Sequence, residues 1–275
     1  MTSAVGTKAE VLLVGCGKMG GALLAGWLKG HAIARAVVVD PGPGPDAFVG
    51  DARVTVLKSG RELEAGFAPD VVVIAVKPQM MADAAPVYRD IVRRGAVVLS
   101  IAAGKTIHHF ETLYGAETAI VRAMPNTPAA IGRGISVAVP NGRVDAAQQA
   151  LCGRLLEAGG DVEWVSDERL IDVVTAVSGG GPAYVFLLIE TLAAAGVAAG
   201  LPSDLAMKLA RTTVSGAGEL ARQSTESAEQ LRRNVTSPNG TTQAALAVLM
   251  ADGALPDLMV QAIAAATRRS RELAE

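Results

Sequence analysis

A row of hydroxyl side chains near the C-terminal end of the chain has the residue types to bind a small anion. Residues 234–245 have the sequence NVTSPNGTTQAA, a Pro-Asn-Gly turn followed by the start of an alanine-rich helix. Free backbone N–H groups at a helix N-terminus attract anions, whereas capping such a helix needs only one hydroxyl. The stretch therefore predicts an anion-binding site, with a plain capped helix as the alternative.

A glycine-rich loop near the N-terminus has the spacing of a dinucleotide-binding turn. Residues 15–20, GCGKMG, follow the apolar run EVLLVG (10–15) and precede a helical pattern over 18–29. In this motif the first glycine permits a tight turn, the second lets the backbone approach a pyrophosphate, and the third lets helix and sheet pack closely. The loop predicts a dinucleotide site, with a ligand-free glycine turn as the alternative.

Asp40 ends the second apolar run, about 20 residues after the glycine loop, where an acid can hydrogen-bond the adenosine ribose. A carboxylate at this place repels a 2′-phosphate and favours NADH over NADPH. Two alternatives stay open: Asp40 caps the PGPGP turn at 41–45, or Lys58 or Arg61 receives a phosphate.

Three further segments, 75–79 (AVKPQ), 100–104 (SIAAG) and 124–128 (MPNTP), each follow an apolar run. Ligands of open α/β sheets bind beyond the carboxyl ends of the strands, so these segments are expected to line the same site. Lys77 adds a cation in a rigid Lys-Pro turn, and Asn126 adds an amide suited to a nicotinamide carboxamide. Turn formation alone is the alternative for each.

The elements that must position these residues alternate in the first part of the chain and are helical afterwards. Strands are expected at 10–15, 36–40, 54–57, 70–76, 96–103, 119–125 and 135–139, and helices at 18–29, 167–177, 182–199, 203–222, 241–252 and from 256 onward. The alternation predicts an α/β fold with a Rossmann-type doubly wound sheet in residues 1–165. Residues 166–275 are expected to form an all-helical domain. Pro182 suits its first helical turn, Gly200 a helix stop, and Ser203 an N-cap.

Composition excludes several other classes of protein. The net charge is −2 and aromatic residues make up 3%, which argues against nucleic acid as a partner. Cys16 and Cys152 make no disulfide framework, and no signal-peptide pattern begins the chain, so a cytoplasmic location is expected. His108-His109 suits an exposed helix start better than a metal site, and no metal is expected.

The segment 182–202, PAYVFLLIETLAAAGVAAGLP, is apolar enough to suggest a membrane span. Glu190 lies in its middle, where an unpaired carboxylate would be costly in lipid. Its many Ala and Gly residues suit close helix packing instead. We expect a helix in a soluble core or a subunit interface, and no membrane.

Over nearly its whole length the chain resembles the pyrroline-5-carboxylate reductase family. The motifs that carry the resemblance are GCGKMG (15–20), AVKP (75–78), AAGKTI (102–107), VRAMPNTP (121–128), AVSGGGPAY (176–184), GLP (200–202) and LRRNVTSPNGTTQAAL (231–246). The last is the most specific. The resemblance implies a Rossmann domain, a helical dimerisation domain, dimers that assemble into rings, and reduction of the cyclic imine pyrroline-5-carboxylate to L-proline by NADPH or NADH.

Motif matching implies the site residues. The cofactor is expected to contact Gly15, Cys16, Gly17, Lys18, Met19, Gly20, Ala75, Val76, Lys77, Pro78, Ile101, Ala102, Ala103 and Asn234, besides Asp40 and Asn126. The substrate is expected to contact Glu168, Ser237, Gly240, Thr241 and Thr242. The helix N-terminus and the hydroxyls suit the substrate carboxylate, and Thr242 is our candidate for the ring nitrogen. A protonated imine needs no strong protein acid near neutral pH.

The sequence departs from the family pattern in two places. Two other functions are alternatives to the reductase. Asn239 stands where the family has glycine, and Asn tolerates positive φ better than most residues. KSGRELE (58–64) lacks an expected asparagine, which leaves the choice of cofactor open. A hydroxyacid dehydrogenase would need an acid such as Lys208, which lies in no motif. A nucleotide-sensing protein without turnover would not need the hydroxyls of 237–242.

Overall fold

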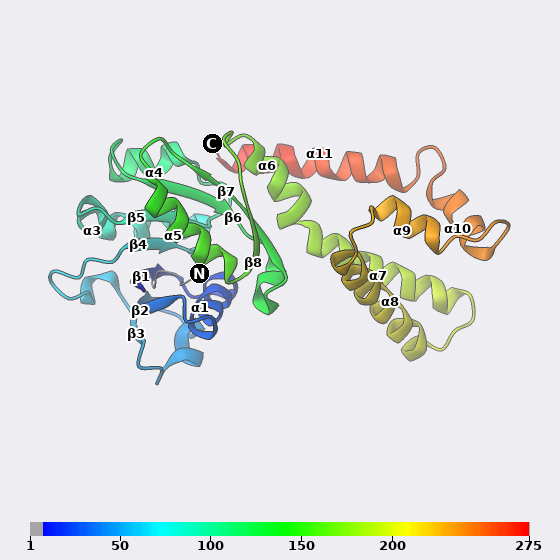
Figure 1. Ribbon diagram of the computed structural model, residues 1–275, viewed down its shortest axis with the longest axis horizontal. Coiled ribbons are helices and arrows are strands. Elements are labelled where there is room, and N and C mark those ends of the chain that lie inside the picture. Colours follow the sequence, from blue (N-terminus) through cyan, green and yellow to red (C-terminus); the bar gives the residue numbers. More distant parts are fainter. Residues whose placement is uncertain (1–7, 275) are drawn as a thin grey trace, which may run out of the picture. The chain divides into compact units, whose positions relative to one another are not determined.

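The computed structural model describes residues 8–274, which form two compact units (Figure 1). The first contains the chain up to Gly179 together with the last residues from Ala266, and the second is Gly180–Ala265. The predicted division after residue 165 coincides with the end of the last strand rather than with this boundary. The expected lack of a signal peptide concerns residues that lie largely outside the described range.

The first unit is built on one sheet, whose eight described strands have the order β3-β2-β1-β4-β5-β6-β7-β8. Their bounds are β1 Ala9–Val14, β2 Ile33–Val39, β3 Val54–Leu57, β4 Val71–Ile74, β5 Val97–Ser100, β6 Ile120–Met124, β7 Gly134–Pro140 and β8 Gly160–Trp164. Neighbouring strands are parallel except for the antiparallel pair β6 and β7. The order reverses between β1 and β4, which confirms the predicted doubly wound α/β class.

The helices of the first unit are α1 Lys18–Lys29, α2 Met81–Ala84, α3 Arg89–Arg93, α4 Ile107–Tyr114, α5 Ala146–Glu157 and α6 Leu170–Val174, followed by a π-helical turn, Thr175–Gly179. The second unit contains α7 Gly181–Ala198, α8 Ser203–Gln223, α9 Ala228–Asn234 and α10 Thr241–Leu249. Helix α11, Leu255–Ala274, begins in the second unit and ends in the first.

Both faces of the sheet are buried, which explains why the strands are continuous apolar runs. On one face Leu13 packs in a cluster with Trp27 of α1 and Leu155 of α5, and the Trp27 indole N–H donates a hydrogen bond to the Leu155 carbonyl oxygen at 2.7 Å. On the other face Leu12 packs in a cluster with Phe110 of α4. The sheet is therefore held between two helical layers, and its strand ends form a rigid edge.

The structure corrects several sequence-based expectations. Strand β8 was missed because its residues, GDVEW, alternate between half-buried and exposed positions instead of forming an apolar run. Helix α9 begins inside the segment 222–230, which we interpreted as a linking loop, and the Ser227 side chain caps it by accepting from the Gln230 N–H. Pro202, not Ser203, is the N-cap residue of α8.

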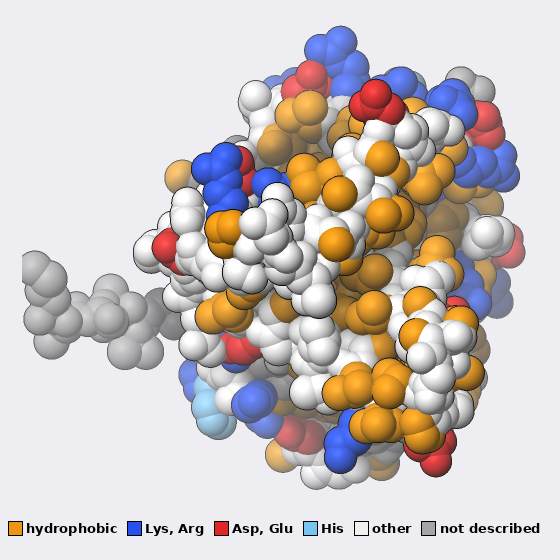
Figure 2. Space-filling view, turned by 90° about the vertical axis from the view of Figure 1, so that its right-hand side faces the viewer, with side chains coloured by type: hydrophobic (Ala, Val, Ile, Leu, Met, Phe, Trp, Pro, Cys, Tyr) orange, Lys and Arg blue, Asp and Glu red, His pale blue; other side chains and the backbone are white. Residues whose placement is uncertain are grey.

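The second unit is almost without a core of its own. Its buried residues are Ala193, Ala206 and Ala210. Helices α7 and α8 approach closely where a Cβ on Gly196 would lie 3.3 Å from the Ala206 Cβ. Phe186 and Leu187 of α7 are 59% and 58% exposed, and hydrophobic side chains gather on the face shown in Figure 2. A helix with apolar side chains on all its faces, such as α7, is normally buried against other elements.

Within the described residues, one continuous helical stretch, Leu170–Ala198, is long and apolar enough to cross a membrane by length and composition alone. Almost none of its most apolar part is buried inside the chain. The prediction that this helix is buried in the core of its own chain is therefore wrong. The alternative, that it lies in a subunit interface, stays a prediction.

Candidate functional site

A cavity of about 360 Å³ opens beyond the carboxyl ends of β1, β2 and β4, where the strand order reverses. It is lined by Val14, Gly15, Gly17, Val39, Asp40, Pro41, Lys58, Ser59, Gly60, Ala75, Val76, Lys77, Met80, Asp83, Ala84, Val87 and Tyr88. The predicted residues that it brings together are Gly15, Gly17, Asp40, Ala75, Val76 and Lys77. Lys18 and Met19 open α1 beside it, and Pro78 opens the next turn.

The glycine loop has the geometry that a pyrophosphate requires. Gly15 has φ +92°, and a Cβ there would lie 2.9 Å from the Ala75 carbonyl carbon. A Cβ on Gly20 would collide with the Gly15 carbonyl oxygen, whereas one on Gly17 would meet nothing within 4 Å. Gly17 is the N-cap residue of α1, and no side chain caps this helix. Free N–H groups therefore face an open approach, which fits a dinucleotide.

Asp40 is fixed at the edge of the cavity by two backbone donors. Its Oδ2 accepts from the Cys16 N–H at 2.6 Å, and its Oδ1 accepts from the Gly42 N–H at 2.7 Å. The carboxylate thus caps the turn after β2, as our alternative interpretation held, and still lines the cavity. Burial and the nearby Asp40 raise the pKa of the Cys16 thiol to about 11, so the thiol is neutral at pH 7.

Of the two candidate phosphate ligands, Lys58 lines the cavity, and its Nζ donates to the Gly42 carbonyl oxygen at 3.1 Å. Arg61 lies in the short turn Gly60–Glu62 and is not a lining residue. A cation and the Asp40 carboxylate therefore border the same end of the cavity.

One wall of the cavity was not predicted. Met80, Ala84 and Val87 line it with the buried Tyr88, and the Met80 and Val87 side chains are 46% and 45% exposed. An apolar wall of this kind suits the flat face of an adenine ring. Its sequence signal was weak, because these residues are spread over several short helical turns after the AVKP motif.

The segments 100–104 and 124–128, which we expected to line the cofactor site, lie at the ends of β5 and β6. Ile101 and Ala102 are buried, and Ala103 is exposed. The Asn126 amide is already engaged, because its Oδ1 accepts from the Ile135 N–H at 3.0 Å and its Nδ2 donates to the Ser178 Oγ at 3.2 Å. Asn126 thus joins the MPNTP and SGGGP motifs, and its contact with the cofactor stays a prediction.

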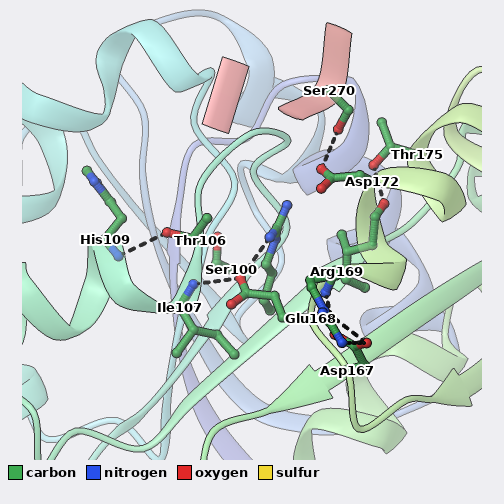
Figure 3. A network of polar contacts seen from close by, with 12 residues as sticks. Ser100, Thr106, Ile107, His109, Asp167, Glu168, Arg169, Asp172, Thr175 and Ser270 are labelled. Atoms are coloured by element: carbon green, nitrogen blue, oxygen red, sulfur yellow. Dashed lines mark hydrogen bonds and ion pairs between the residues drawn. The ribbon is translucent and has the colours of Figure 1, made fainter. Parts of the chain in front are cut away.

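Glu168 lies in the first unit, in a network of polar contacts shown in Figure 3. Its Oε1 accepts from the Arg122 Nη1 at 2.7 Å and from the Ile107 N–H at 2.8 Å. The Arg122 side chain is only 3% exposed. Arg122 was missed, although a charged residue inside the apolar strand AIVRAMP was an available signal. Contact between Glu168 and substrate stays a prediction.

The other predicted substrate residues lie in the second unit, at the start of α10. Gly240 is the N-cap residue, and no side chain caps the helix. Asn239 has φ +57°, so the turn keeps its left-handed residue without the family's glycine. Within residues 8–274, the hydroxyls of Ser237, Thr241 and Thr242 make no side-chain hydrogen bond. Three hydroxyls and a free helix N-terminus are thus available to a ligand.

The predicted cofactor residue Asn234 also lies in the second unit. Its Nδ2 donates to the Glu226 Oε2 at 3.0 Å, and its Oδ1 accepts from the Gln230 Nε2 at 2.7 Å. Asn234 therefore belongs to a different unit from the other predicted cofactor residues.

No group of three His, Cys, Asp or Glu side chains within residues 8–274 is placed to hold a metal ion. His108 and His109 lie in the first turn of α4, where the Thr106 side chain accepts from the His109 N–H at 3.2 Å. Burial and the charge of Lys105 lower the pKa of His109, so its imidazole is neutral at pH 7.

Comparison with known proteins gives a consistent result along the whole chain. The family model for pyrroline-5-carboxylate reductase dimerisation matches residues 168–273, and that for NADP oxidoreductase, coenzyme F420-dependent, matches residues 10–104. Pyrroline-5-carboxylate reductase of Pseudomonas aeruginosa is 39% identical over 97% of both chains, and that of Pisum sativum is 37% identical over 94% of both.

Two solved structures are similar over nearly the whole chain. A pyrroline-5-carboxylate reductase from Coxiella burnetii has a TM-score of 0.90 and 34% identity, and the match covers 98% of this chain and 100% of the other. Pyrroline carboxylate reductase of Plasmodium falciparum, solved with NADP bound, has a TM-score of 0.80 and 29% identity, and the match covers 98% and 100%.

Proposed function

This chain belongs to the pyrroline-5-carboxylate reductase family, and from that premise we propose that it catalyses the NAD(P)H-dependent reduction of 1-pyrroline-5-carboxylate to L-proline. The observation that carries the proposal is the 39% identity to a reductase over 97% of both chains. The structural support is a glycine loop with an open helix N-terminus in one unit and a hydroxyl-rich helix N-terminus in the other.

In the proposed cofactor site, the N–H groups at the start of α1 bind the pyrophosphate, because Gly17 leaves their approach open. Asp40 accepts from the adenosine ribose, and Met80 and Val87 contact the adenine. Ile101, Ala102, Ala103 and Asn126 line the nicotinamide end, and Asn234 contributes from the second unit. When bound, the reduced nicotinamide supplies a hydride to the imine carbon.

In the proposed substrate site, the start of α10 binds the substrate carboxylate through free N–H groups and the hydroxyls of Ser237 and Thr241. The Thr242 hydroxyl hydrogen-bonds the ring nitrogen and orients the C=N bond. Reduction of the protonated imine leaves a secondary amine, so no strong protein acid is required. This agrees with the absence of a histidine from this motif.

We propose NADH as the preferred cofactor. The Asp40 carboxylate is held by two backbone donors at 2.6 and 2.7 Å, so it cannot turn away easily from a 2′-phosphate. Lys58 opposes this effect, but its ammonium is engaged with the Gly42 carbonyl oxygen. We therefore expect the fixed carboxylate to have the larger effect on a 2′-phosphate.

We further propose a cytoplasmic homodimer that pairs through the helices of residues 166–275, with residues 1–165 as the dinucleotide-binding domain. The exposed apolar helix α7 and the dimerisation model that matches 168–273 support this pairing. Assembly of dimers into a ring is part of the proposal, whereas no role in nucleic-acid or membrane binding is included.

The test is the rate of NADH and NADPH oxidation with pyrroline-5-carboxylate, measured side by side. We expect turnover with both and a higher kcat/KM with NADH. Thr242→Ala should lower kcat by about 100-fold or more, because the imine loses its orientation, with NADH affinity kept. Thr112→Ala, an exposed threonine bonded only within α4, is the matched control. Absence of turnover in the wild type would refute the reaction.

A further inference from the structure

The loop between β5 and α4, residues 101–106, is held by two segments that are distant in sequence. At its C-terminal end, the Glu168 Oε1 accepts from the Ile107 N–H at 2.8 Å. In its middle, Gly104 has φ +70°, and a Cβ there would lie 3.1 Å from the Leu273 carbonyl oxygen. The segment after β8 and the last turn of α11 therefore both contact this loop or its end.

The Glu168 contact is firm because Glu168 forms an ion pair with a buried arginine. Arg122 of β6 is 3% exposed and donates to the same Oε1 at 2.7 Å. Removing one member of such a pair leaves a buried charge without its partner, which is costly. Glu168 thus fixes the start of α4 relative to β6.

The end of α11 is fastened to the same segment. The Ser270 Oγ–H donates to the Asp172 Oδ1 at 2.7 Å, and Ser270 is 6% exposed. Asp172 lies in α6, four residues after Glu168, and Figure 3 shows Glu168 bonded to Ile107 at the start of α4 and Asp172 bonded to Ser270. All of these residues belong to the first unit, although α11 reaches it only after passing through the second.

We propose that Ser270 and Asp172 are positioning residues for the nicotinamide-side loop. Their hydrogen bond holds the last turn of α11 in place, and Leu273 in that turn contacts Gly104 and limits movement of residues 101–106. The inference rests on the proposed role of Ile101, Ala102 and Ala103 in cofactor binding. Hydride transfer depends steeply on the distance between donor and acceptor, so a loosened loop slows the reaction without removing any reacting group.

The test compares Ser270→Ala and Asp172→Ala with the conservative variants Ser270→Thr and Asp172→Asn, which keep a donor and an acceptor. Ser215→Ala is the matched control, because Ser215 is exposed and bonds only within α8. Two quantities are measured, namely kcat with NADH and the dissociation constant of ADP-ribose. ADP-ribose lacks only the nicotinamide base, so its affinity reports on the adenosine, pyrophosphate and ribose contacts.

We expect both alanine variants to lower kcat by about fivefold or more with ADP-ribose affinity unchanged. The double alanine variant should match either single variant, since both lose the same bond. The conservative variants should stay near the wild type.

Three results would overturn the inference: alanine variants that turn over like Ser215→Ala, a parallel loss of ADP-ribose affinity, or conservative variants as slow as the alanine ones. A wild type that binds ADP-ribose without turnover would instead refute the proposed function, and the inference would fall with it.

Discussion

The two units of this chain differ in how they bury their apolar residues. The first encloses its sheet between two buried clusters, with Leu13 and Leu99 in one and Leu12 in the other at 0% exposure. The second buries only Ala193, Ala206 and Ala210 and leaves Phe186 and Leu187 of α7 more than half exposed. The first unit therefore buries a hydrophobic core of its own. The second leaves apolar side chains exposed, which pairing with a second chain would bury.

This difference separates the proposed tasks. A rigid sheet edge suits the cofactor, because its loops must hold fixed N–H groups and carboxylates. A helical unit that lacks its own core suits assembly, because its apolar helices gain stability from a second copy. The predictions below test whether the two units respond differently to comparable changes.

The largest expected effect is on assembly. Leu187→Glu places a charge on the apolar face of α7, where a second copy would bury it at high cost. We expect light scattering to show loss of the oligomer and turnover to fall with it. Val49→Glu, at a 70% exposed position of the first unit, should change neither. An unchanged oligomer for Leu187→Glu would contradict the dimer interface.

A smaller effect is expected on stability. Leu99→Ala removes a side chain that is 0% exposed in β5 and should lower the free energy of unfolding by about 2–5 kcal/mol. This loss should not depend on protein concentration, whereas the loss caused by Leu187→Ala should shrink as the protein is concentrated. Urea titrations at two protein concentrations measure the loss in free energy of unfolding for each variant. If both losses depend on concentration in the same way, the proposed difference between the two units is wrong.

The next effect concerns the cofactor and should stay within the first unit. Asp40→Ser removes the carboxylate held against Cys16 and Gly42 and should raise the NADPH-to-NADH ratio of kcat/KM by about tenfold. The oligomer should be unaffected. Asp46→Ser, an exposed acid of the next turn, is the control. A ratio that stays constant would mean that Lys58 or another group decides the preference.

The smallest expected effect concerns the two cysteines, which we expect to resist alkylation in the native protein. Burial raises the pKa of Cys16 to about 11 and that of Cys152 to about 12. A raised pKa keeps each thiol protonated at pH 8, so both should react with iodoacetamide far more slowly in the native protein than in urea. Mass spectrometry counts the labelled sites, and rapid labelling of the native chain would show that the first unit opens readily.

Much of the first unit was predictable because its signals are local. The helix 18–29 and the strand 54–57 were predicted with the bounds that the structure has, since a glycine loop and apolar runs mark them. Strand β8 and helix α9 were missed, because a half-exposed edge strand and a polar, serine-capped helix lack an apolar periodicity.

The sequence by itself determined the doubly wound sheet, the glycine loop, the hydroxyl-rich turn and the family, because each depends on residue types at fixed short spacings. Only the tertiary structure decided what Asp40, Asn126 and Glu168 contact, since their partners lie up to 61 residues away. It also decided that the last turn of α11 lies against Gly104. Contacts of this kind arise when distant segments pack together, and no local pattern encodes them.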